Sequence, residues 1–142
     1  MKKLESGHSM VEMLGVLAII GVLSIGGISG YTLSMRRHRA NGIADTIAKY
    51  ALVAYGKCQQ DILNGDSCGG NYMQFADAGI GDAPAGVRSI AIDNIDIDTS
   101  EGVDSVEVLI TLQDSKLCQA LASIVGKSCN GGDMISISIK QN

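Results

Sequence analysis

A run of uncharged, mainly apolar residues from position 13 to position 35 constrains this chain more than any other feature. As a helix, the run would span about 30 Å, which is one hydrocarbon thickness of a bilayer. Glu12 lies at its entrance, and a charged side chain near a bilayer core costs roughly 2.5–3.5 kcal/mol. An ordinary secretory signal or membrane anchor does not need this acid, so Glu12 is predicted to be functional.

The rest of the chain has the composition of an ordinary soluble domain. It has no Trp, one Phe and one Pro, which predicts an aliphatic core. The chain has 15 acidic and 11 basic residues and a net charge of −4. Five of the basic residues flank the apolar run, so the part downstream of them is more acidic still and lacks the clustered Lys and Arg that phosphate contacts require. Nucleic-acid binding is therefore not expected. Basic residues flank the apolar run on both sides, so the positive-inside rule gives no orientation: Lys2, Lys3, Arg36, Arg37 and Arg39.

The apolar pattern continues beyond the arginines at three- and four-residue spacing, which predicts one buried helix face. Its members are Ile43, Ile47, Tyr50, Ala51, Ala54, Cys58 and Ile62. No proline precedes Pro84. We therefore predict one continuous helix from about Ser9 to about Leu63, apolar all round in its first half and amphipathic in its second. Asn64 and Gly65 provide the stop.

The remaining residues predict a small α+β head. Residues 65–86 are rich in Gly, Asp and Ala and indicate an irregular loop. Alternating patterns predict strands at 87–92, 106–112 and 135–139. A short helix is expected from Asp114 or Ser115, as the cap, to Val125, with Gly126 ending it. The sheet should be antiparallel and lie on the amphipathic part of the long helix. The domain organisation is then 1–7 (leader), 8–35 (apolar helix), 36–64 (amphipathic half) and 65–142 (head).

The segment Gly7-His8-Ser9-Met10-Val11-Glu12-Met13-Leu14, followed by the apolar helix, resembles the type IV pilins and the pseudopilins of type II secretion. The resemblance implies cleavage after Gly7 by a prepilin peptidase, possible N-methylation at the new terminus His8, and an acid at the fifth mature position, Glu12. Two positions depart from the family pattern. His8 stands where relatives mostly carry Phe or Met, and Ser29 stands where many carry a kinking proline.

The resemblance also implies a location and partners. The subunit would be held by one span in a bacterial inner membrane and then extracted by assembly machinery into a pilus or pseudopilus of pilin-like subunits. A carboxylate among packed apolar helices must be protonated or paired, and the α-ammonium at His8 is the nearest cation. The alternative is that Glu12 lies among lipid headgroups. Gly26 and Gly30 form a small-xxx-small pair that permits close helix packing, although glycine is also common in membrane helices.

Four cysteines all lie beyond residue 57, with none in the leader or the apolar run, and they allow three disulfide pairings. Cys58–Cys68 and Cys118–Cys129 are favoured, because both pairs close short loops. The second pair resembles the carboxy-terminal disulfide loop of many pilins, and with the Ile-Ser-Ile-Ser-Ile strand it resembles the type IVb group. A zinc site is the alternative, although close Cys-x-x-Cys spacing and a nearby histidine are lacking.

An acidic run lies between the first two predicted strands. Four of its residues fall at the offsets of EF-hand calcium ligands: Asp96, Asp98, Ser100 and Glu107. Glu101 replaces the required glycine and the flanks predict strands, so a solvated hairpin connection is favoured over calcium binding. No cofactor is expected.

The sequence does not predict an enzyme. His8 and His38 lie at the two ends of the apolar segment, away from the head, and no nucleophile–base pair or phosphate loop stands out. Two alternatives to a pilin-like subunit remain open. One is a periplasmic binding or enzymatic domain whose signal peptide is cut between Ser24 and Gly30. The other is a permanently anchored single-pass protein.

Overall fold

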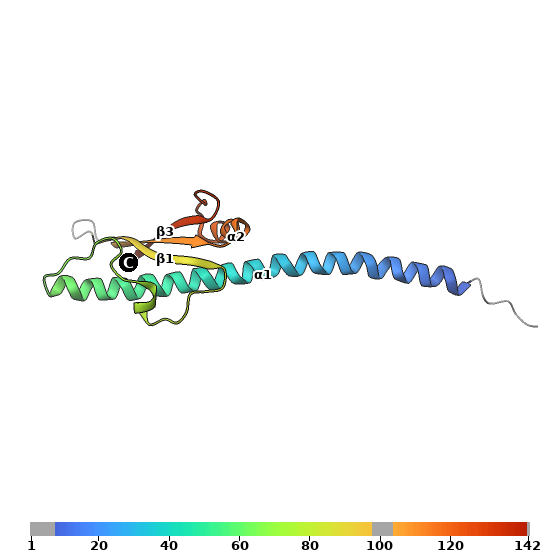
Figure 1. Cartoon of the computed structure of the whole chain (residues 1–142), viewed down its shortest axis with the longest axis horizontal. Coiled ribbons are helices and arrows are strands. Elements are labelled where there is room, and N and C mark those ends of the chain that lie inside the picture. Colours follow the sequence, from blue (N-terminus) through green and yellow to red (C-terminus); the bar gives the residue numbers. More distant parts are fainter. Residues whose placement is uncertain (1–7, 98–103, 142) are drawn as a thin grey trace, which may run out of the picture. The chain divides into compact units, whose positions relative to one another are not determined.

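The computed structural model describes residues 8–97 and 104–141, and these residues have an α+β fold (Figure 1). This confirms the predicted fold class. In chain order the elements are α1 (His8–Leu63), the 3-10 turn η1 (Phe75–Ala78), β1 (Val87–Asp96), β2 (Asp104–Leu112), α2 (Ser115–Val125) and β3 (Met134–Gln141). The chain divides into two compact units, Met1–Met35 (unit 1) and Arg36–Asn142 (unit 2). The boundary falls where the apolar run ends and the arginines begin.

Helix α1 starts within one residue of the predicted position and ends at Leu63, as predicted. At its end the amide of Asn64 donates to the carbonyl of Gln60 at 3.2 Å, and the amide of Gly65 donates to that of Ile62 at 3.0 Å. Gly65 has a φ of 91°, a conformation that side-chain-bearing residues rarely adopt. A glycine directly after the last turn is therefore what stops the helix.

The three strands form an antiparallel sheet in the order β1-β2-β3. The prediction was too short for β1, which continues past Ile92 to Asp96. The pairing with β2 shifts register between Ile92 and Asn94, and this irregularity returns Ile95 to the buried face. Since an alternating pattern assumes a strict period of two, it cannot follow a strand across such a bulge.

The core of unit 2 lies between one face of the sheet, the second half of α1 and α2. Its largest fully buried side chains come from all of these elements: Tyr50, Ile43, Ile47, Ile92, Ile110, Leu112, Leu121 and Ile135. Helix α2 is capped as predicted. The Asp114 carboxylate accepts a hydrogen bond from the amide of Lys116 at 3.0 Å, and Gly126 ends the helix with a φ of 68°.

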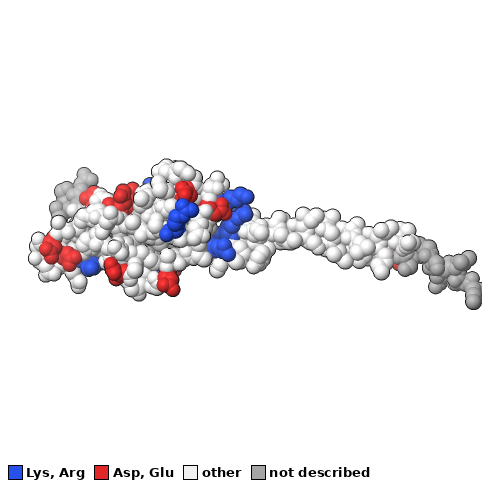
Figure 2. Space-filling model, viewed as in Figure 1, with Lys and Arg blue, Asp and Glu red and all other residues white. Residues whose placement is uncertain are grey.

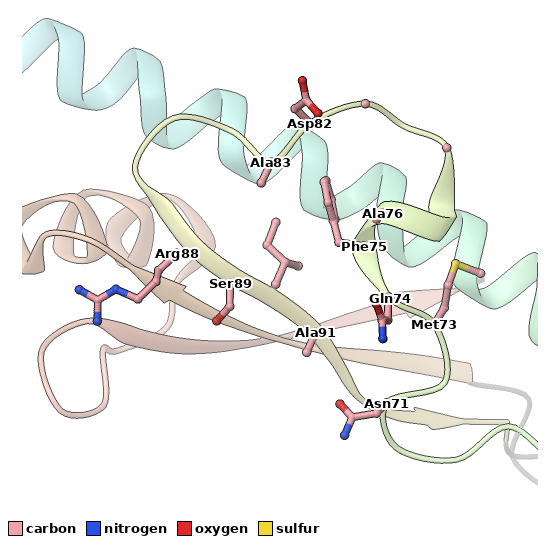
Figure 3. A pocket seen from close by; sticks show the side chains of 13 residues that line it. Asn71, Met73, Gln74, Phe75, Ala76, Asp82, Ala83, Arg88, Ser89 and Ala91 are labelled. Atoms are coloured by element: carbon pink, nitrogen blue, oxygen red, sulfur yellow. The ribbon is translucent and has the colours of Figure 1, made fainter.

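The connection from α1 to β1 is more ordered than the irregular loop predicted from the sequence. It contains η1, and its residue Gln74 forms a β-bridge with Ala91 of β1. The amide of Asn71 donates a hydrogen bond to the carbonyl of Ile92 at 2.9 Å. The buried Tyr50 hydroxyl donates to the carbonyl of Met73. Between this connection and β1 lies an open pocket of about 920 Å³, shown with its lining side chains in Figure 3.

Candidate functional site

The first half of α1 exposes its apolar side chains on every side. From Met10 to Leu33, the large apolar side chains are 52–74% exposed. The most apolar window of this helix has a mean hydropathy of 2.2 and is not buried at all, so α1 is a candidate membrane span. Exposed apolar surface costs about 25 cal/mol per Å² in water, so burying this segment in an apolar surrounding would stabilise it.

Three hydroxyl side chains in this segment donate hydrogen bonds to the backbone of their own helix. Ser24 donates to the carbonyl of Ile20 at 2.7 Å, Ser29 to that of Gly26 at 3.0 Å, and Thr32 to that of Ser29 at 2.9 Å. Such back-bonding removes the cost of placing a hydroxyl in a medium without water. Ser29, which stands where many type IV pilins carry a kinking proline, continues the helix here.

Glu12 is the one acid of this apolar half. It is exposed, and it forms no hydrogen bond or ion pair with any residue that the structure describes. Helix α1 begins at His8, so Glu12 lies about one turn, or roughly 6 Å, from the start of the helix. Gly7, the predicted cleavage residue, lies outside the described residues.

Gly26 and Gly30 are one helical turn apart and therefore share a face. Apart from the adjacent backbone of its own helix, a Cβ atom added to either glycine would meet no atom within 4 Å. The chain itself therefore does not require glycine at these positions, and both are free to receive a neighbouring helix.

No protein-family model, curated protein or solved structure matches this chain. The interpretation of the site therefore rests on its residues.

In unit 2, the cysteines form the pairing favoured from the sequence. Cys58 is joined to Cys68 and Cys118 to Cys129, with Cα–Cα distances of 5.7 and 6.2 Å. No free cysteine remains. With all four sulfurs in disulfides, this structure offers no cysteine thiolate as a zinc ligand.

The acidic run differs in part from the predicted hairpin connection. Asp96 lies in β1 and Glu107 in β2, while the other two calcium candidates, Asp98 and Ser100, lie outside the described residues. Glu107 accepts a hydrogen bond from the Ser136 hydroxyl at 2.5 Å. Among the described residues, no group of three or more potential ligands could hold a metal ion.

Two tyrosine–carboxylate hydrogen bonds, which the sequence analysis missed, link elements of unit 2. The Tyr55 hydroxyl on α1 donates to Asp104 at the start of β2, and this bond raises the pKa of Tyr55. The Tyr72 hydroxyl donates to Asp61 on α1. Burial and this hydrogen bond raise the pKa of Tyr72 to about 12. The Tyr55 partner lies 49 positions away, and no local sequence pattern indicates a contact of that kind.

Proposed function

We propose that this chain is a pilin-like structural subunit, processed by a prepilin peptidase and assembled through its N-terminal helix into a type IV pilus or type II secretion pseudopilus. One observation carries the proposal. The first half of α1 is apolar and exposed on every side, with a single acid near its start, whereas unit 2 buries a core of its own.

Two environments would cover this helix in turn. Before assembly, the hydrocarbon of the inner membrane covers it, and the segment has the length for that. After assembly, equivalent helices of other copies replace the lipid. The small pair Gly26 and Gly30 favours this exchange, since bare helix surface allows backbones to approach closely.

Glu12 would set the axial register between copies. Cleavage after Gly7 creates an α-ammonium at His8, about 6 Å along the helix from Glu12. In an apolar surrounding, both charges are costly alone and stable together. A pair formed between neighbouring copies would therefore select one relative shift of their helices, as a single buried polar residue does in a coiled coil.

Mass spectrometry of the exported molecule tests the processing step. A mature chain that starts at His8 and keeps the apolar helix is the expected result. A start after a residue between Ser24 and Gly30 would instead establish an ordinary signal peptide. An unprocessed chain that prepilin peptidase leaves at full size would establish a permanent anchor.

The assembly step is tested with Glu12→Ala. Cleavage after Gly7 should be unchanged, because the peptidase acts before the helix meets its neighbours, while the yield of sheared filaments should fall at least tenfold. Met13→Ala is the matched control, since it removes apolar surface next to Glu12 without removing the charge, and its yield should change much less. Normal filament yield from Glu12→Ala would refute the pairing mechanism.

A further inference from the structure

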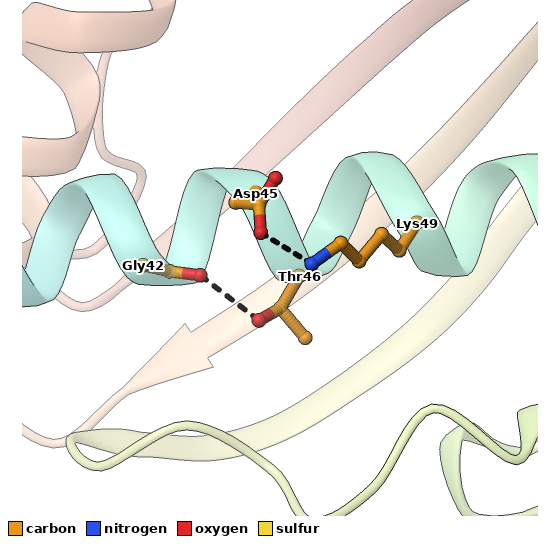
Figure 4. A network of polar contacts seen from close by, with 4 residues as sticks. All are labelled: Gly42, Asp45, Thr46 and Lys49. Atoms are coloured by element: carbon orange, nitrogen blue, oxygen red, sulfur yellow. Dashed lines mark hydrogen bonds and ion pairs between the residues drawn. The ribbon is translucent and has the colours of Figure 1, made fainter.

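Three arginines at the start of unit 2 have no ionic partner in the described part of the chain. Arg37 and Arg39 are exposed and Arg36 is half-buried. By contrast, Lys49, further along α1, pairs with Asp45 at 2.6 Å (Figure 4). In Figure 2 the largest group of blue atoms covers the start of unit 2. If unit 2 is exported, this arginine cluster (Arg36, Arg37 and Arg39) lies on the exported side of the apolar segment, whereas the positive-inside rule favours positive charge on the cytoplasmic side. The proposed function leaves it unexplained.

The opposite end of unit 2 carries a small acidic pocket of about 320 Å³. Two exposed aspartates line it, Asp66 after the end of α1 and Asp96 at the end of β1, and neither forms an ion pair with a described residue. The rest of the lining is mostly apolar: Ile62, Ile95, Ile97, Ser67 and the disulfide of Cys58 with Cys68. We call this the acid-end pocket.

The local structure holds the acid-end pocket in place. The disulfide ties the chain after α1 back to the helix. The backbone that follows lies directly against β1, where the amide of Asn71 donates to the carbonyl of Ile92 at 2.9 Å. A Cβ atom at Gly70 would come within 2.9 Å of the carbonyl oxygen of Asp93, so only glycine permits this approach. Asp66 and Asp96, which are far apart in sequence, are thereby brought to one pocket.

The chemistry of the pocket matches an arginine side chain. An arginine has an aliphatic stem, which can lie on isoleucine side chains, and a planar guanidinium that donates to carboxylates in a fixed fork. Two carboxylates beside an apolar wall offer both parts of that arrangement. We infer that the acid-end pocket of one subunit receives an arginine from the arginine cluster of a second copy of this chain.

The arginine must come from another molecule. Arg36 and Ile62 lie on the same helix, and the residues between them span about 40 Å at 1.5 Å per residue. No side chain bridges that distance. The two copies would therefore be displaced by about 40 Å along α1, stacked end to end through their folded units. This inference rests on the proposed function only in supplying neighbouring copies.

Photocrosslinking of the full-length chain in its own membranes tests the inference directly. A photoreactive amino acid replaces Arg37, and adducts are mapped by peptide mass spectrometry. The expected product is a covalent dimer joining position 37 of one copy to a peptide that contains Asp66 or Asp96 of another. Dimers joined elsewhere, or adducts to lipid alone, would overturn the inference.

Charge exchange supplies a second readout. Arg37→Glu and Asp96→Arg should each lower the filament yield several-fold, and the double variant should recover most of the loss. Lys127→Glu, an exposed charge reversal outside both surfaces, is the control and should leave the yield unchanged. If the single variants assemble normally, or if the double variant shows no recovery, the contact does not exist.

An anionic membrane surface is the competing occupant of the arginine cluster. If lipid is the true occupant, Arg37→Glu should bind phosphatidylglycerol vesicles more weakly than the wild type, and adding Asp96→Arg should restore neither this binding nor the filament yield. That result would also overturn the inference. Cleavage after Gly7 is measured in every variant. Failure of the proposed function appears as a missing cleavage or absent filaments in the wild type, whereas failure of this inference leaves both intact.

Discussion

Removing either disulfide should destabilise unit 2 by a similar and large amount. Cys58–Cys68 closes a loop of sequence separation 10 and Cys118–Cys129 one of 11. In the chain-entropy model, loops of this length stabilise the folded state by about 3 kcal/mol at 25 °C, because the cross-link restricts the unfolded chain. Since a domain of this size has a total stability of roughly 5–15 kcal/mol, each bridge supplies a substantial share.

Alanine is the appropriate replacement, because Cys58 and Cys118 are fully buried and serine would bury a hydroxyl without a partner. The paired variants Cys58→Ala/Cys68→Ala and Cys118→Ala/Cys129→Ala are unfolded in urea in detergent solution, with tyrosine fluorescence as the signal. Wild type reduced with dithiothreitol is the control for loss of both bridges.

The two double variants should lose about equal free energy of unfolding, near 3 kcal/mol each. A loss below about 1 kcal/mol in either would contradict the loop-closure reasoning, because it would mean that the unfolded chain is already constrained. A large difference between them would contradict it too, since their loop lengths are almost equal.

Two further predictions concern tyrosines of unit 2. Tyr50→Phe leaves the carbonyl of Met73 without its donor, so urea unfolding should show a loss of about 1–3 kcal/mol, whereas Tyr31→Phe on the exposed helix should show almost none. Tyr72 is expected to ionise near pH 12, which ultraviolet absorbance of wild type against Tyr72→Phe would measure. Because its folded-state pKa is raised above 10, its contribution to stability should be present below pH 10 and lost as the pH rises from 10 through 12. A Tyr72→Phe difference spectrum that titrates at pH 10 would contradict that assignment.

Features set by local sequence were predictable. Continuous three- and four-residue spacing without proline located α1, and the glycines at 65 and 126 located two helix ends. These signals suffice because a helix is held by contacts between residues three or four positions apart. The pattern of β3 was equally direct, as its alternation is uninterrupted.

Features set by distant contacts were not predictable. The last residues of β1 depend on a bulge against β2, and η1 depends on the bridge between Gln74 and Ala91. The Tyr55–Asp104 bond joins residues 49 positions apart. Propensity cannot locate such features, because tertiary packing decides them.

The candidate site divides in the same way. Glu12, Gly26 and Gly30 were identified from spacing along one helix, and the structure places them on an exposed apolar segment. The acid-end pocket could not be identified from the sequence. Asp66 and Asp96 line the same pocket only because the Cys58–Cys68 disulfide and Gly70 hold the segment after α1 against β1. Glu12 and the aspartates of the acid-end pocket form no ion pair with a described residue, which is consistent with contacts made between copies.

The two proposed contacts constrain one another. In a helical filament every subunit is equivalent, so the axial displacement between any two subunits is a whole multiple of one rise. Pairing of Glu12 with the His8 amine requires a displacement of about 6 Å, extended by the reach of the carboxylate side chain. Contact between the arginine cluster and the acid-end pocket requires about 40 Å. The copy that pairs with Glu12 is therefore a different neighbour from the copy that offers its arginine. Both contacts can form in one filament only if the displacements of about 6 Å and about 40 Å are both whole multiples of the same axial rise. Each proposed contact therefore limits the values of the rise that the other contact allows.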